Sequence, residues 1–300
     1  MNEVCTLNDY QNAIEIKNVS KKFDGFALDN INFVVPKGSI MGFVGQNGAG
    51  KTTTIKSLLN ICKIDSGEIK IFGLDSVQHE LDIKKNIAVV FDEIPFHDVL
   101  NATQLDKILK EIYESWDTNT FNGYLERFGL PKKKKISQLS KGMKMKLQIA
   151  IALSHNADLL IMDEATGGLD PVVRNEMLDV FMEYIQDENH SILMSSHITS
   201  DLEKIADSIT FIHNGKILMS GYKDDILENH GILKCSKNDI SKIATSDIVS
   251  IRISNFGAEI MLKDLLSCRK NYHDFVIDKT TLDEILLFYV RGMDKKEWSI

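Results

Sequence analysis

Cysteine is scarce in this sequence: there are four in 300 residues, Cys5, Cys62, Cys235 and Cys268, and no two of them form a C-x-x-C pair. Scattered single cysteines argue against a disulfide framework or a zinc site and are typical of reduced thiols in the cytosol. Long apolar runs are lacking as well, since none approaches the roughly 18 to 20 residues of a membrane span. The start, MNEVCTLNDY, has no basic-then-apolar signal pattern. We therefore expect a cytoplasmic protein, and any membrane role must come through a partner.

Positive charge is in deficit. The chain has 35 lysines and arginines against 43 aspartates and glutamates, which gives a formal charge of −8. A field of this sign repels polyanions and argues against nucleic acid as a partner. It does not exclude a small anion such as a nucleotide, because a local cluster of backbone N–H groups outweighs a weak, distant field.

The sequence also has no internal repeat and no low-complexity tract, and its 43 % apolar and 26 % charged residues are ordinary for a globular protein. Short apolar and alternating segments predict a mixed α/β fold. Strands are expected at 14–19, 31–35, 39–44, 68–72, 87–91, 159–162, 192–195, 209–213 and 216–220. Helices are expected at 51–60, 141–153 and 171–186, with a polar helical stretch from about 98 to 135.

The pattern changes after Gly221. Segments 249–254 and 259–263 alternate as strands do, and a helix is expected over 281–290. We interpret 222–300 as a small α+β unit appended to a larger domain over 12–221.

A glycine-rich loop joins the expected strand at 39–44 to the expected helix at 51–60. It fits the pattern G-x-x-x-x-G-K-[ST], in which the glycines let backbone N–H groups point at phosphate oxygens and the helix adds its positive end. The lysine can reach the β- and γ-phosphates, and the first threonine can ligate Mg²⁺. The alternative, a flexible loop that matches by chance, is disfavoured by the strand before it and the helix after it. The candidate nucleotide-binding residues are Gly45, Gln46, Asn47, Gly48, Ala49, Gly50, Lys51, Thr52 and Thr53.

Two carboxylates, Asp163 and Glu164, follow the apolar run 159–162. The carboxyl end of a buried parallel strand is where α/β sheets bind ligands. Asp163 is placed to hold Mg²⁺, and Glu164 to orient a water molecule for attack on the γ-phosphorus. A strand that simply leaves the core for solvent would look the same, but the phosphate loop in the same chain disfavours that alternative.

A second possible anion site lies at the start of helix 141–153. Ser140 is a natural N-cap, Gly142 follows closely, and a helix N-terminus attracts negative charge. For an isolated helix, ordinary capping would explain both residues.

The order of these motifs resembles the ATP-binding cassette (ABC) ATPases over roughly residues 14–220. Leu139-Ser140-Lys141-Gly142-Met143 is similar to the signature segment of that family, Gly168-Leu169-Asp170 to its D-loop, and His197 to its switch histidine. The resemblance implies a P-loop cassette with a RecA-like core, an antiparallel β subdomain and a helical subdomain at about 95–155. Taken alone, His197 could equally be a structural histidine, and Asp170 with Pro171 could simply start the next helix.

The resemblance also implies a head-to-tail pair of cassettes, homodimeric or heterodimeric, with ATP and Mg²⁺ buried between them. Ser140 and Gly142 would contact the γ-phosphate held by the partner chain, and Asp170 would lie near the dimer axis. Because both halves hold the γ-phosphate, its hydrolysis lets the dimer open.

Some positions depart from the family pattern. Asp92 stands where a metal-associated glutamine is usual, so a shorter carboxylate would face the Mg²⁺, unless the alignment is off by one residue. Lys141 and Met143 replace a common glycine and glutamine. Phe23 stands where a tyrosine often stacks on adenine; its ring can still stack, or it can belong to the core.

These observations favour the ATPase subunit of a bacterial-type transporter, acting at the inner face of the cell membrane on a separate integral-membrane permease. Residues 280–286 are similar to the closing helix of exporter ATPases, which favours export. The alternative is a soluble ABC ATPase that acts on ribosomes or DNA, although the chain has one cassette and the interval from Lys51 to Ser140 shows no sustained heptads. A P-loop kinase would leave the signature segment and His197 unexplained.

Overall fold

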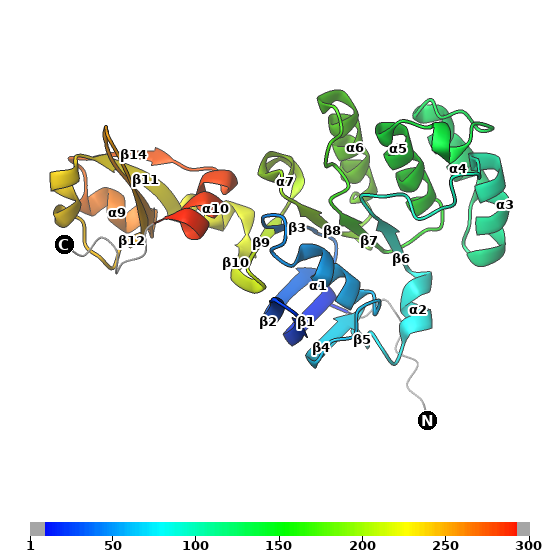
Figure 1. The fold of residues 1–300 in the computed structure, drawn as a ribbon, viewed down its shortest axis with the longest axis horizontal. Helices are drawn as coiled ribbons and strands as arrows, with labels where there is room; N and C mark the ends of the chain where they lie inside the picture. Colours follow the sequence, from blue (N-terminus) through cyan, green and yellow to red (C-terminus); the bar gives the residue numbers. More distant parts are fainter. Residues whose placement is uncertain (1–9, 293–300) are drawn as a thin grey trace.

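The protein is described here as a computed structural model covering residues 10–292, within which the strands form three sheets (Figure 1). Cys5 and the last eight residues of the 222–300 unit lie outside the described residues. The α/β cassette fold expected from the sequence is confirmed, and its four-stranded first sheet and six-stranded central sheet share one core.

The first sheet is antiparallel, with strand order β2-β1-β4-β5. Along β1, the buried Ile14 and Ile16 alternate with Glu15 and Lys17, so one face packs inward and the other meets solvent. The strands are β1 (Asn12–Phe23), β2 (Phe26–Pro36), β4 (Ser66–Ile71) and β5 (Leu74–Asp75).

The central sheet has the order β10-β9-β3-β8-β7-β6 and is parallel except for β10, which pairs antiparallel with β9. Every residue of β3, β7 and β8 is buried, as expected for short apolar strands covered on both faces. Asn214 and Gly215 have φ angles of 46° and 72°, the positive values that a two-residue hairpin turn between β9 and β10 requires. The strands are β3 (Ile40–Val44), β6 (Ile87–Val90), β7 (Leu159–Asp163), β8 (Ser191–Ser196), β9 (Ser208–His213) and β10 (Lys216–Tyr222).

Helices cover the central sheet, and α3, α4 and α5 form a layer at the end farthest from β9 and β10 (Figure 1). Ser140 caps α5, since its Oγ accepts a hydrogen bond from the Met143 N–H at 3.3 Å. Across residues 10–292, no helix is long and apolar enough to cross a membrane. The helices are α1 (Lys51–Leu58), α2 (Glu80–Lys85), α3 (Ala102–Ile112), α4 (Thr118–Arg127), α5 (Lys141–Ala152), α6 (Pro171–Tyr184) and α7 (Thr199–Ile205), with a 3₁₀ turn at Ile136–Gln138.

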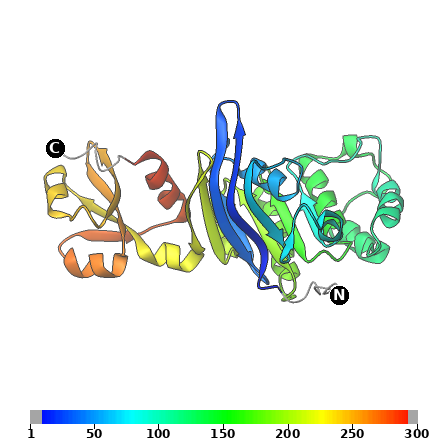
Figure 2. The ribbon, with the colours of Figure 1, turned by 90° about the horizontal axis from the view of Figure 1, so that it is seen from below.

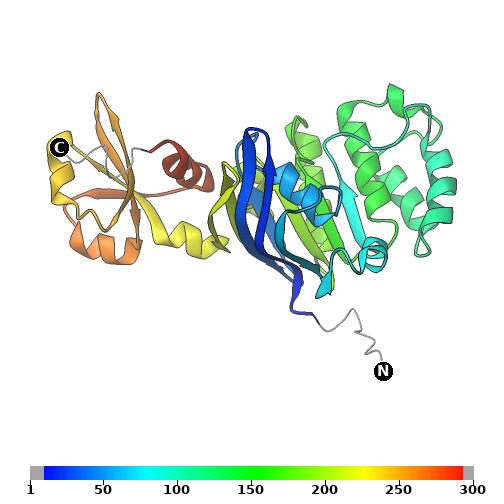
Figure 3. The same ribbon diagram turned by 60° about the horizontal axis from the view of Figure 1, so that its bottom comes forward.

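The third sheet is antiparallel, β12-β13-β11-β14, and lies beside β9 and β10 rather than over the central sheet (Figures 2 and 3). It has its own small core, but α10 packs back on α7, where the Leu282 N–H donates to Glu203 Oε1 at 2.6 Å. Ile285 and Phe288 of α10 are fully buried in the main core of the molecule. The elements are α8 (Lys223–Asn229), β11 (His230–Cys235), β12 (Ile248–Ser254), β13 (Gly257–Lys263), α9 (Leu265–Asn271), β14 (Val276–Lys279) and α10 (Leu282–Arg291), with a 3₁₀ helix at Lys237–Lys242.

Candidate functional site

The glycine-rich loop joins β3 to α1 in a conformation that needs its glycines. Gly48 and Gly50 have φ angles of 81° and 117°, which favour glycine. A Cβ on Gly45 would lie 2.5 Å from the carbonyl oxygen of Ile212, closer than real side chains come. The loop therefore packs against β9 and curls back to the start of α1.

A cavity of about 530 Å³ opens at the N-terminus of α1. Phe26 borders this cavity, whereas Phe23, predicted to stack on a base, is 45 % exposed with its ring centroid 6.4 Å from that of Phe26. Phe26 was not among the residues predicted from the sequence. Asp24-Gly25 is a hairpin signal that places the two phenylalanines on either side of one turn, and it could have identified Phe26. The cavity is lined by Phe26, Asn47, Gly48, Gly50, Lys51, Thr52, Thr53 and Glu164.

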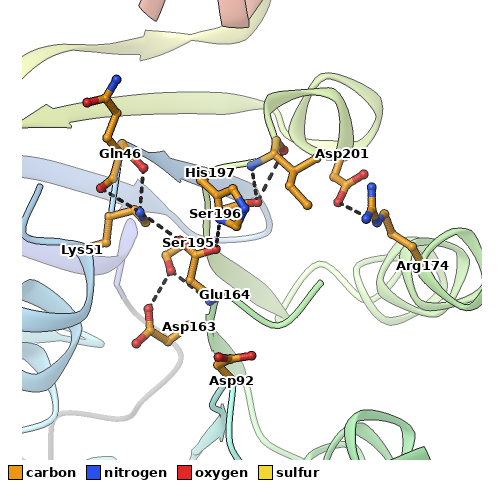
Figure 4. A network of polar contacts seen from close by, with 12 residues as sticks. Gln46, Lys51, Asp92, Asp163, Glu164, Arg174, Ser195, Ser196, His197 and Asp201 are labelled. Carbon is orange, nitrogen blue, oxygen red and sulfur yellow. Dashed lines mark hydrogen bonds and ion pairs between the residues drawn. The ribbon is translucent and has the colours of Figure 1, made fainter. Parts of the chain in front are cut away.

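Lys51 and Glu164 line this cavity, and His197 contacts Glu164 beside it (Figure 4). The Lys51 ammonium is only 5 % exposed and donates to the carbonyl oxygens of Gly45 at 2.6 Å and Gln46 at 3.2 Å. It also lies 2.9 Å from Glu164 Oε1. The other carboxylate oxygen of Glu164 lies 2.5 Å from His197 Nδ1. Three residues predicted from separate motifs thus form one contiguous polar group.

Ser195, which the sequence analysis also missed, connects Asp163 to Glu164. Its hydroxyl donates to Asp163 Oδ1 at 2.7 Å and accepts the Glu164 N–H at 3.1 Å (Figure 4). Asp163 is buried at the end of β7, next to Ser195 at the end of β8. A buried serine that follows an apolar strand, just before His197, was the available signal.

Other predicted site residues lie outside this group. Asp92 is exposed and pairs with Lys141, whose Nζ lies 2.8 Å from Asp92 Oδ1. Asp170 caps α6 by accepting the N–H groups of Val172 and Val173. Ser140, Gly142 and Asp170 do not border the cavity at the glycine-rich loop.

Oxygen donors suited to a magnesium ion are present. Thr52 lines the cavity, and Asp163 ends the strand directly before Glu164. Hydroxyl and carboxylate oxygens are the ligands that Mg²⁺ prefers, commonly completed by phosphate oxygens and water. These residues therefore fit the ion.

Comparisons with known proteins agree with this arrangement. The ABC transporter family matches residues 28–167. The bacitracin transport ATP-binding protein BcrA of Bacillus licheniformis is 39 % identical over 194 residues, covering 64 % of this chain and 63 % of BcrA. The lantibiotic transport ATP-binding protein SrtF of Streptococcus pyogenes is 34 % identical over 209 residues, covering 69 % of this chain and 89 % of SrtF.

A solved structure of the ATP-binding subunit of an ABC transporter superposes with a TM-score of 0.65 at 27 % identity, over 71 % of this chain and 91 % of that one. The glycine-rich loop and the acidic end of β7 both lie within residues 28–167, the range that matches the family. The chain belongs to the ATP-binding proteins of the ABC transporter family.

Proposed function

We propose that this chain hydrolyses ATP and thereby drives a separate membrane permease. The observation that carries the proposal is the Glu164 carboxylate, whose two oxygens contact Lys51 and His197 beside the glycine-rich loop. A carboxylate in this place can orient a water molecule for attack on a γ-phosphate held by the loop. The transport names of the relatives support coupling to a permease.

The loop and α1 would bind the phosphates. Gly48 and Gly50 line the cavity, so backbone N–H groups of the loop are available to phosphate oxygens, and Lys51 supplies a positive charge. The phenylalanine pair Phe23 and Phe26 offers an aromatic surface for the base. His197 would hold the Glu164 carboxylate in place and sense the γ-phosphate.

Magnesium, when bound, neutralises charge on the phosphate oxygens. Thr52 and Asp163 would hold it, and Ser195 fixes the orientation of the Asp163 carboxylate. Asp92 follows β6, which pairs in parallel with β7, so its carboxylate belongs to the same edge of the sheet. To serve as a metal ligand, Asp92 must first leave Lys141.

We infer a dimer from the signature segment. Ser140 is exposed at the N-terminus of α5, and a Cβ added to Gly142 would lie 3.7 Å from Val173, at ordinary contact distance. A helix N-terminus that is open in this way suits the γ-phosphate held by a second cassette. Asp170, at the start of α6, would then lie near the partner.

An apolar groove of about 370 Å³ between β6, α3 and α5 is the surface that we assign to the permease. Its wall includes Phe91, the residue before Asp92, so a permease segment in the groove would act next to the nucleotide site. Its rim carries Ile61 and Ile112, which are exposed apolar side chains. The groove is lined by Leu59, Ile61, Lys84, Ile87, Val89, Phe91, Pro95, Phe96, Leu109, Ile112, Tyr113, Gln148, Ile151, Ala152 and His155.

Export is the direction we favour, because the relatives are named for transport of bacitracin and lantibiotics. Such a chain would work at the cytoplasmic face of the membrane, with 12–221 as the ATPase domain and 222–300 as an accessory unit. A soluble ABC ATPase that acts on ribosomes or DNA is the alternative, and its partner would be strongly anionic, against the net charge of −8.

Purification of the tagged full-length chain from native membranes tests the proposal. We expect ATPase activity and a co-purifying multi-span protein. The Ile112→Glu variant, changed at the groove, should no longer co-purify with the multi-span protein but should still bind ATP. Ile108→Glu is the matched control on α3, because Ile108 is 41 % exposed and does not line the groove. Recovery of ribosomes or DNA instead, or equal retention by both variants, would contradict the assignment.

A further inference from the structure

An ion pair between α6 and α7 lies beside the polar group of Lys51, Glu164 and His197 without touching it (Figure 4). Arg174 Nε is 3.8 Å from Asp201 Oδ2, and the two side chains are 24 % and 2 % exposed. In the described part of the chain, neither of these two atoms has a hydrogen-bond partner. A buried carboxylate is costly unless a cation accompanies it, and Arg174 is that cation.

Arg174 also holds the end of the loop that begins at Glu164. Its Nη2 donates to the backbone carbonyl of Leu169 at 3.1 Å. Within the loop, the Gly167 N–H donates to the Glu164 carbonyl at 3.0 Å and the Leu169 N–H to the Thr166 carbonyl at 3.4 Å. The Arg174 guanidinium is therefore connected to Glu164 through the hydrogen-bonded backbone of residues 164–169.

Asp201 lies on the helix that follows His197. It belongs to α7, which begins at Thr199, two residues after His197. The Ile198 N–H donates to Ser196 Oγ at 2.9 Å, which links the end of β8 to the start of this helix. One arginine thus connects the loop that carries Glu164 to the helix that follows His197.

We propose that Arg174 and Asp201 are positioning residues that set the distance between Glu164 and His197 and the placement of the 164–170 loop. The inference rests on the proposed function, because it concerns the same hydrolytic site. Neither residue touches the cavity, so their loss should misplace the catalytic groups without removing the nucleotide-binding surface. Misplacement by about 1 Å can lower a rate by about 100-fold.

The test compares Arg174→Ala with Lys204→Ala in the full-length chain. Lys204 Nζ donates to Asn175 Oδ1 at 3.0 Å, so it also joins α7 to α6 but does not reach the Leu169 carbonyl. For Arg174→Ala we expect kcat to fall about 10- to 100-fold, while KM for ATP and the Kd of a fluorescent ATP analogue change less than about twofold. Arg174→Lys, which keeps the charge but not the planar fork, should recover part of kcat.

If the buried Asp201 left alone prevents folding of Arg174→Ala, the neutral double variant Arg174→Gln with Asp201→Asn replaces it and should show the same split between kcat and KM. The inference is overturned if the kcat of the arginine variant equals that of Lys204→Ala, or if kcat and nucleotide affinity fall together. Failure of the proposed function is separate, because the wild-type chain would then lack ATPase activity itself.

Discussion

The backbone of Glu164 has a φ of +56°, in the left-handed region that residues with a side chain rarely adopt. Hydrogen bonds hold it there: the Glu164 N–H donates to the hydroxyl and the carbonyl of Ser195, and its own carbonyl accepts the Gly167 N–H. Strain of this kind costs about 1–3 kcal/mol and persists where surrounding contacts over-determine it. The conformation directs the carboxylate towards Lys51 and His197.

Glu164→Gln should reduce kcat for ATP by at least about 100-fold, because an amide cannot accept the proton of the attacking water. ATP binding should be retained, since Lys51 and the loop N–H groups remain, and the nucleotide-loaded variant should accumulate as a dimer. Steady-state hydrolysis and light scattering measure the two effects. Glu188→Gln, an exposed glutamate outside the cavity, serves as the control; ordinary turnover by Glu164→Gln would refute its catalytic role.

Site residues that belong to a sequence motif could be predicted. Residues that contribute through contacts with other helices or strands could not. Lys51 and Glu164 were identified from fixed spacings and from the strand that precedes each. Ser195, Arg174 and Asp201 carry no spacing rule, because their partners lie on other elements.

At the scale of elements, length decided what could be predicted. Helices α5 and α6 have several periodic apolar positions, and their expected ranges agree with the structure, whereas the long strands β1 and β2 extend well beyond the expected 14–19 and 31–35. Helices α2, α7 and α8 have six or seven residues, too few for the period to show, and none was predicted. The third sheet was recognised only as alternating pieces, since its pairing joins segments far apart in sequence.

Ser140, the N-cap of helix α5, is one of the residues that we assign to the partner's phosphate. Ser140→Arg places a bulky cation at this N-terminus, so we expect it to block ATP-dependent dimerisation while the monomer keeps its affinity for ATP. Analytical ultracentrifugation and equilibrium nucleotide binding measure these effects. Ser137→Arg, an exposed serine just before the segment, is the control. Loss of nucleotide binding by the Ser140→Arg monomer would contradict a role in trans.

At the scale of the whole molecule, two buried histidines make stability depend on pH. Burial lowers the pKa of His155 and of His230 below the usual 6.5, although backbone carbonyls beside each ring act in the opposite direction. Below pH 6.5 the unfolded chain therefore binds protons that the native chain excludes. The free energy of unfolding should fall with decreasing pH, by up to about 1.4 kcal/mol per pH unit for each histidine.

Urea unfolding at several pH values between 7.5 and 5.5 measures this slope. The pH dependence of the free energy of unfolding should be weaker in His155→Gln than in the wild-type chain. It should be unchanged in His273→Gln, a substitution at an exposed histidine. An unchanged slope in His155→Gln would contradict the contribution of His155.

The C-terminal sheet and the cassette should unfold together, because α10 contributes Phe288 to the main core. Phe288→Ala should lower the free energy of unfolding by about 3–5 kcal/mol and shift a single circular-dichroism transition. Phe256→Ala is the matched control, since that residue is fully exposed in the turn between β12 and β13 of the same unit. Two separate transitions would show that the units are independent.

The return of α10 to α7 also bears on synthesis. Domains tend to fold as they leave the ribosome, N-terminal parts first. Here the helix that follows His197 receives Leu282 and its neighbours only after some eighty further residues have been translated. A ribosome-bound nascent chain that already contains the glycine-rich loop would therefore still lack the contacts of α10 with α7, and we expect ATPase activity to appear only after translation has passed α10.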